Sequence, residues 1–125
     1  SLKEMIVAEG LAENFAVQLY GKEKLGPWVS KTDLETLNQL VKPFLREHLD
    51  VRGMQKITAY LYGDKIAAMM GQDGVGMPYC AGYACGYYLV KYYLEKTGQT
   101  IEEATFLPAS EILAEADEFW TETTH

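Results

Sequence analysis

Apolar residues recur every three to four positions along most of the chain, which is the period of an amphipathic helix. The longest such segment covers residues 2–20 and stops at Gly21, a residue type that commonly follows a helix. A second long segment covers residues 78–96. The pattern predicts an all-α fold, a compact bundle of about five to six helices that forms a single domain over residues 1–125.

The middle of the chain is less regular. Residues 32–49 fit a helix with a kink or break near Val41, because Pro43 cannot donate the hydrogen bond that a continuous helix needs. Residues 54–64 fit both the alternation of a strand and the period of a helix, and helix is preferred. Residues 71–78 contain three glycines and are predicted to form a linker rather than a phosphate-binding loop.

Glu9 and Glu13 lie four positions apart in an otherwise apolar part of the first helix. At about 100° per residue, the helix has one apolar and one polar side. The residues assigned to the inward side are Leu2, Met5, Ala12, Ala16, Leu19 and Tyr20, and those assigned to solvent are Lys3, Glu4, Gly10, Asn14 and Gln18. Glu9 falls within the inward group and Glu13 about 40° further round, so both carboxylates are predicted to face inward, where a proton, a Lys or Arg side chain, or a metal ion would have to compensate them.

Charge and cysteine content narrow the possible functions. The net charge of −7 with scattered basic residues argues against a nucleic-acid partner. Apolar runs are broken well before the roughly 20 residues that span a bilayer, so we expect no membrane span. Cys80 and Cys85 are predicted to be buried free thiols in a reducing compartment, and a cytoplasmic location is expected.

Five separated stretches carry a resemblance to a known family. They are "EGLAENFAVQLYG", "LGPW", "AYLYGD", "GMPYCAGYACGYYLVKYYLEK" and "LPASEIL". In this order they resemble the C-terminal part of a bacterial family of predicted zinc-dependent proteases, YjaZ-like and of the gluzincin type. Such proteases carry two histidine ligands and a glutamate base on an H-E-x-x-H helix, and a downstream Glu as the third zinc ligand. The resemblance implies that Glu9 is this metal ligand and that Glu13 orients a histidine ligand by accepting its hydrogen bond.

The sequence departs from that family pattern because it contains no H-E-x-x-H. Its two histidines, His48 and His125, do not have the required neighbours. By the resemblance, we expect the chain to be a fragment of a larger metallopeptidase domain that binds zinc in the full-length protein. The chain alone is expected to hold no metal and to be inactive, since one carboxylate without imidazoles binds zinc weakly. A degenerate homologue is the alternative.

The helix predicted over residues 78–96 has tyrosines at four-residue spacing, at Tyr79, Tyr83 and Tyr87. A phenol beside a zinc site is able to stabilise a developing oxyanion, and Tyr83 is the candidate catalytic residue because it is central in this stripe. The competing interpretation is that these tyrosines are core aromatics with their hydroxyl groups at the edge of the core.

Two classes of function follow. The first is a metallopeptidase subdomain that supplies Glu9 and part of the cleft for a peptide or protein substrate. The second is a non-catalytic helical module that binds a protein or peptide, with Glu9 and Glu13 in structural salt bridges to Lys42, Arg46 or Arg52. A face exposed by truncation would also allow a homo-oligomer.

Overall fold

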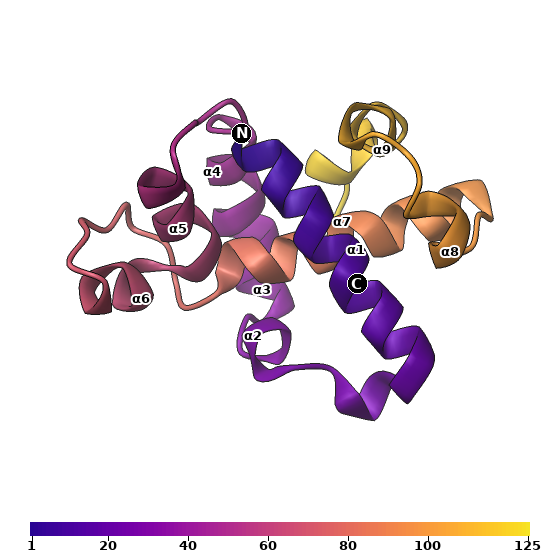
Figure 1. Cartoon of the computed structure of the whole chain (residues 1–125), viewed down its shortest axis with the longest axis horizontal. Coiled ribbons are helices and arrows are strands. Elements are labelled where there is room, and N and C mark those ends of the chain that lie inside the picture. The colour runs from indigo at the N-terminus through magenta and orange to yellow at the C-terminus, as the bar shows by residue number, and fades with distance from the viewer.

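The computed structural model describes the backbone of residues 1–125 and all side chains except those of Lys24 and Pro27. It confirms the all-α fold class, and no strand occurs in this described chain. Two long helices, α1 (Leu2–Tyr20) and α7 (Ala81–Thr97), cross near the middle of the molecule (Figure 1). The shorter elements are η1 (Lys22–Lys24), α2 (Pro27–Ser30), α3 (Leu34–Thr36), η2 (Leu37–Val41), α4 (Lys42–Arg46), α5 (Met54–Tyr62), α6 (Asp64–Met69), α8 (Ile101–Ala104), α9 (Ala109–Glu115) and η3 (Asp117–Trp120). The elements are shorter and more numerous than the predicted five to six helices.

The predicted break in the second segment is confirmed. A π-helical turn, η2, occupies Leu37–Val41, and Pro43 lies in the first turn of α4 directly after it. Because proline has no N–H, a local change in the hydrogen-bonding pattern is a common response next to it. The helix preferred for the ambiguous segment is also confirmed as α5, which Gly63 separates from α6 with a φ of 91°.

The second long helix starts later than the sequence predicts. Helix α7 begins at Ala81 instead of Pro78, because Cys80 adopts a left-handed conformation with φ of 50°. The Ala81 N–H still bonds to the Pro78 carbonyl at 3.1 Å, so a single turn leads into the helix. At the other end the helix extends one residue past the predicted range, to Thr97, and Gly98 terminates it with φ of 73°.

The crossing of α1 and α7 depends on two glycines. A Cβ atom at Gly10 would overlap the backbone carbonyl of Gly86, and a Cβ atom at Gly86 would overlap the carbonyl of Ile6. Beside them Asn14 is buried, and its side-chain amide donates to the Gly10 carbonyl at 2.8 Å and to the Tyr87 carbonyl at 3.0 Å. The closest approach of the two helices is therefore made by small and polar residues of α1.

This crossing corrects the predicted faces of α1. Gly10 and Asn14, assigned to solvent, are buried, whereas Leu19 and Tyr20, assigned to the interior, are 57% and 66% exposed. Ala12 is exposed as well. The assignment was wrong because it ranked positions by hydrophobicity, while a close helix crossing is set by side-chain volume.

The C-terminal segment is tied to the first half of the chain. Lys42 is only 2% exposed; its Nζ donates to the Glu122 carbonyl at 2.8 Å and lies 3.9 Å from the centre of the Phe119 ring. Asn38 exchanges two hydrogen bonds of 2.8 Å with the backbone of Thr124. Burial lowers the pKa of Lys42.

The glycine-rich segment after α6 is an ordered loop. The Asp64 carboxylate accepts hydrogen bonds from the backbone N–H groups of Val75, Gly76 and Met77, at 2.8 to 3.1 Å. These donors lower the pKa of Asp64, because they favour the ionised carboxyl group. The loop therefore folds back onto the start of α6. Along the described part of the chain, no helix combines the length and apolar character needed to cross a membrane.

Candidate functional site

The two carboxylates of α1 have different environments. Glu13 is 6% exposed and faces α7, whereas Glu9, one turn earlier, is partly buried. Burial raises the pKa of the Glu9 carboxyl group, because the ionised form loses hydration. The prediction that both face inward therefore holds fully for Glu13 and partly for Glu9.

Two tyrosines complete a cluster with these carboxylates. The Tyr83 hydroxyl of α7 donates to Glu13 Oε1 at 3.1 Å, and the ring of Tyr62 from α5 stacks on that of Tyr83 with centroids 6.3 Å apart. Burial and the nearby Glu13 charge raise the pKa of Tyr83, and burial and the Glu9 charge raise that of Tyr62. Both phenols therefore stay protonated at neutral pH, and that of Tyr83 donates its proton to the hydrogen bond with Glu13. Tyr62 was missed from the sequence, where only its place in "AYLYGD" marks it.

No Lys or Arg side chain that the structure describes forms an ion pair with Glu9 or Glu13. The ion pairs between described residues join the Ser1 amino group to Glu4, Lys3 to Asp50, and Lys91 to Glu95. Lys42 instead bonds to a backbone carbonyl in the C-terminal segment. The predicted alternative of salt bridges from Lys42, Arg46 or Arg52 to the two carboxylates is therefore wrong for the described side chains.

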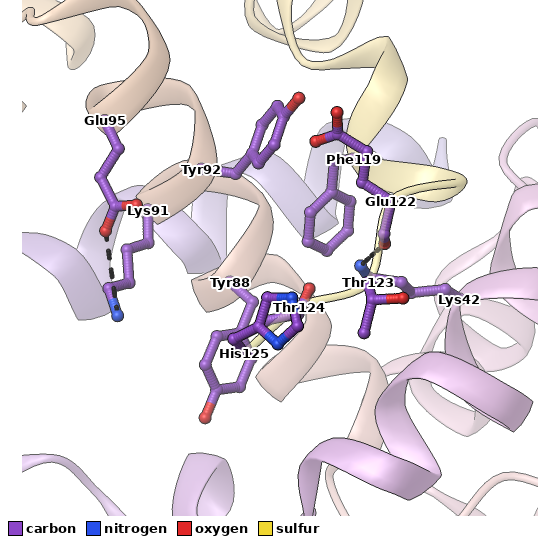
Figure 2. A pocket seen from close by; sticks show the side chains of 10 residues that line it. All are labelled: Lys42, Tyr88, Lys91, Tyr92, Glu95, Phe119, Glu122, Thr123, Thr124 and His125. Atoms are coloured by element: carbon purple, nitrogen blue, oxygen red, sulfur yellow. Dashed lines mark hydrogen bonds and ion pairs between the residues drawn. The ribbon is translucent and has the colours of Figure 1, made fainter.

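The two histidines, His48 and His125, are not part of the carboxylate–tyrosine cluster. The His48 ring packs against Phe44 and Tyr60, with centroid distances of 4.5 and 5.2 Å. His125 lines a pocket of about 200 Å³ between α7 and the C-terminal segment (Figure 2). Among the described residues, no group of three His, Cys, Asp or Glu side chains is arranged to hold a metal ion. The described side chains thus offer carboxylate oxygens near Tyr83 but do not form a complete zinc site.

The cysteines are free and buried, as predicted. Burial raises the pKa of Cys85 to about 12 and also raises that of Cys80. A thiol with a raised pKa is a poor nucleophile and a poor metal ligand at neutral pH. Cys80 lies next to the carboxylate–tyrosine cluster, where its backbone N–H donates to the Tyr62 carbonyl at 2.9 Å.

An apolar stripe of α1 borders Glu9 on its outer side. Ala8, Ala12, Phe15 and Leu19 are all exposed, and their spacing of four, three and four positions places them on one side of the helix. Phe15 and Leu19 are 39% and 57% exposed. We refer to these four residues as the outer stripe. Contiguous exposed apolar residues of this kind often mark a surface for another protein segment.

The fold and the cluster define an all-α protein with one buried and one partly buried glutamate, and no described Lys or Arg side chain forms an ion pair with either. Comparison with known families identifies the class, since the family model described as "Predicted Zn-dependent protease (DUF2268)" matches residues 1–114. The chain belongs to this family of predicted zinc-dependent proteases, as the resemblance implied.

One relative is similar in sequence to almost the whole chain. The chain is 40% identical over 121 residues to the uncharacterized protein YjfC of Bacillus subtilis (strain 168). The aligned region covers 97% of this chain and 40% of that protein, so the chain spans well under half the length of its relative. No solved structure matches the chain.

Proposed function

We propose that the chain is one part of a zinc-dependent peptidase in which Glu9 is a metal ligand and the imidazole ligands come from residues outside these 125. The observation that carries the proposal is the pair of a buried Glu13 and a partly buried Glu9, for which no described cation compensates. Membership in the family of predicted zinc-dependent proteases supports zinc as the compensating ion. A carboxylate oxygen is a common third protein ligand beside two histidines.

Each residue of the cluster has a different role in this proposal. Zinc would supply Lewis-acid activation of water and of a peptide carbonyl. Glu9 is exposed enough to offer a carboxylate oxygen to a metal ion bound at the surface of α1. Glu13 is held by the Tyr83 hydroxyl, and in this proposal it would accept a hydrogen bond from the N–H of a histidine ligand.

Tyr83 stays the candidate catalytic residue. In this structure its hydroxyl donates to Glu13, so its first effect is to fix the orientation of that carboxylate. Direct action on a peptide or protein substrate requires the same hydroxyl to turn from Glu13 toward the substrate. Since the pKa of Tyr83 is raised, the phenol acts as a hydrogen-bond donor and not as a base.

The outer stripe is the proposed contact for the segment that brings the histidines. It lies on the side of α1 that borders Glu9, so a helix packed on it would approach the carboxylate. When the 125 residues are produced alone, the same stripe is expected to pair two copies of the chain. Sedimentation velocity of the isolated chain measures this, and Leu19→Lys should return it to a monomer.

The proposal is tested on the full-length protein by metal content and peptide hydrolysis. The wild type is expected to hold one zinc ion per chain and to cleave an unfolded protein substrate, and Glu9→Gln is expected to lose both. Glu35→Gln serves as a matched control, because Glu35 is an exposed glutamate on α3. A full-length protein without zinc or activity, or a Glu9→Gln variant that keeps its zinc, would refute the proposal.

A further inference from the structure

The two phenols of the carboxylate–tyrosine cluster differ in their hydrogen bonding. The Tyr83 hydroxyl donates to Glu13 Oε1 at 3.1 Å. Glu13 is only 6% exposed, so the loss of this bond would leave a buried carboxylate without that donor, which is costly. The Tyr83 hydroxyl is therefore committed to holding the Glu13 carboxylate.

The Tyr62 hydroxyl has no such commitment. No hydrogen bond joins it to another described residue. In the described part of the chain, the shielded side-chain oxygens that lack a partner belong to Thr32 and Gln72, so the partly buried Tyr62 keeps its hydroxyl open to solvent. A phenol of this kind is able to donate to a ligand without first giving up a bond within the protein.

The backbone fixes the position of the Tyr62 phenol. Tyr62 is the last residue of α5, and its carbonyl accepts a hydrogen bond of 2.9 Å from the N–H of Cys80, directly before α7. A Cβ atom at Gly82 would overlap the Tyr60 carbonyl, so α5 and α7 touch at the level of their backbones. This contact holds the Tyr62 ring against that of Tyr83.

The Tyr62 phenol also lies close to the proposed metal ligand. Helix α5 contacts α1, which carries Glu9 and Glu13. The Glu9 charge contributes to the raised pKa of both Tyr62 and Tyr83, which places both phenols within its electrostatic reach. A substrate bound beside Glu9 would therefore meet a free phenol from α5 and an engaged one from α7.

We propose that Tyr62 is a second catalytic residue, whose hydroxyl donates a hydrogen bond to the carbonyl oxygen of the peptide bond that is cleaved. That oxygen gains negative charge during hydrolysis, and a donor held in place before the reaction stabilises the charge. While its hydroxyl stays on Glu13, Tyr83 is a positioning residue that acts through this carboxylate. The role of Tyr62 rests on the proposed peptidase function and names a residue that contacts the substrate.

Tyrosine-to-phenylalanine variants of the full-length protein test this role, because each removes one hydroxyl and keeps the ring. Tyr62→Phe is expected to lower kcat about 100-fold or more and to leave KM and the zinc content unchanged. In metal-free buffer it should also unfold at the same urea concentration as the wild type, since its hydroxyl has no partner to lose.

Two further variants serve as comparisons. Tyr83→Phe is expected to unfold at a lower urea concentration and to bind zinc about 10- to 100-fold more weakly, because Glu13 loses its donor. Tyr60→Phe is the matched control and should behave like the wild type. Tyr60 also lies on α5 and stacks on an aromatic ring, that of Phe44 with centroids 5.7 Å apart, but it lies two positions before Tyr62 and so faces away from it.

The outcomes separate this role from the proposed function. A wild type without zinc or activity would refute both. An active wild type whose Tyr62→Phe variant keeps its kcat would overturn the role of Tyr62 alone and leave the zinc site in place. Lower stability of metal-free Tyr62→Phe, or loss of its zinc, would show that the hydroxyl is engaged within the fold and is not free for a substrate. An equal loss of kcat in Tyr60→Phe would also overturn the role.

Discussion

Replacing Gly10 with alanine is the most direct test of the helix crossing that positions the candidate site. Gly10 lies between Glu9 and Glu13 on α1, at the point where the helix meets α7. A Cβ atom there would meet the carbonyl oxygen and carbon of Gly86 and a methyl group of Val90. Two of these three atoms belong to backbone, which has no rotamer by which to move away.

Two opposing effects determine the magnitude. Alanine in place of glycine stabilises a helix interior by about 0.5–1 kcal/mol. Adding a methyl group to a tightly packed interior costs about 1–3 kcal/mol, and the backbone contact places Gly10 at the upper end. The expected net loss is about 2 kcal/mol, which for a chain of this size corresponds to a decrease in Tm of roughly 6–10 °C.

Urea and thermal unfolding followed by circular dichroism measure this difference. Ala114→Gly is a suitable control, because Ala114 is exposed on α9 outside the outer stripe and its change should cost no more than the intrinsic preference of about 0.5–1 kcal/mol. The test is whether Gly10→Ala lowers the free energy of unfolding, as the close contact between α1 and α7 requires. A variant as stable as the wild type, or more stable, would show that α1 and α7 do not approach as closely as described.

Three further predictions concern single polar groups. Tyr83→Phe removes the donor to Glu13 and should lower the free energy of unfolding by about 1–3 kcal/mol in urea titrations; an unchanged value would show that this bond is not formed in solution. Asp64 has a pKa held below its ordinary value of 3.8, so its stabilisation is complete above that pH and is lost as the pH falls through the lowered pKa. Asp64→Asn should therefore destabilise the protein at pH 7 and approach the wild type under strongly acidic conditions in the same assay, whereas a difference independent of pH would contradict this origin. Glu9 has a pKa raised above 4.5, so its ionisation opposes folding as the pH rises through the folded-state pKa. Glu9→Gln should thus be at least as stable as the wild type at pH 7 in metal-free buffer, and a large loss of stability would indicate an ion pair instead.

Much of the fold was predictable because it follows from local rules. The period of apolar residues identifies α1, and Gly21 marks its end. Pro43 placed the irregular turn near Val41, since the missing N–H acts on its immediate neighbours. Such signals require only the residues within one or two turns.

The orientation of α1 was not predictable in the same way. Gly10 and Asn14 are weakly hydrophobic, yet they lie at the contact with α7 because a short side chain allows close approach and an amide bonds to the partner's backbone. The apolar residues Leu19 and Tyr20 are exposed instead. These outcomes depend on a helix about 70 positions further along the chain, which no local pattern encodes.

In the candidate site, too, some features follow from the local sequence and others depend on distant parts of the chain. The spacing of Glu9 and Glu13 indicated two carboxylates near one side of a helix, and the tyrosine stripe indicated Tyr83. The hydrogen bond between Glu13 and Tyr83 and the stacking of Tyr62 on Tyr83 require the relative placement of three helices. The space between α5 and the loop that follows α6 likewise depends on Asp64, whose carboxylate holds that loop in place.

The buried ammonium group of Lys42 has a consequence for the order of folding. Its acceptor, the carbonyl of Glu122, lies 80 positions later in the sequence. During synthesis on the ribosome, the Lys42 ammonium group of α4 stays hydrated until the Glu122 carbonyl has emerged from the exit tunnel. Closing so long a loop is slow compared with forming local helices, so the final packing around Lys42 belongs to the late steps of folding. Nascent chains that stop short of this segment would thus present an incomplete core to chaperones and proteases.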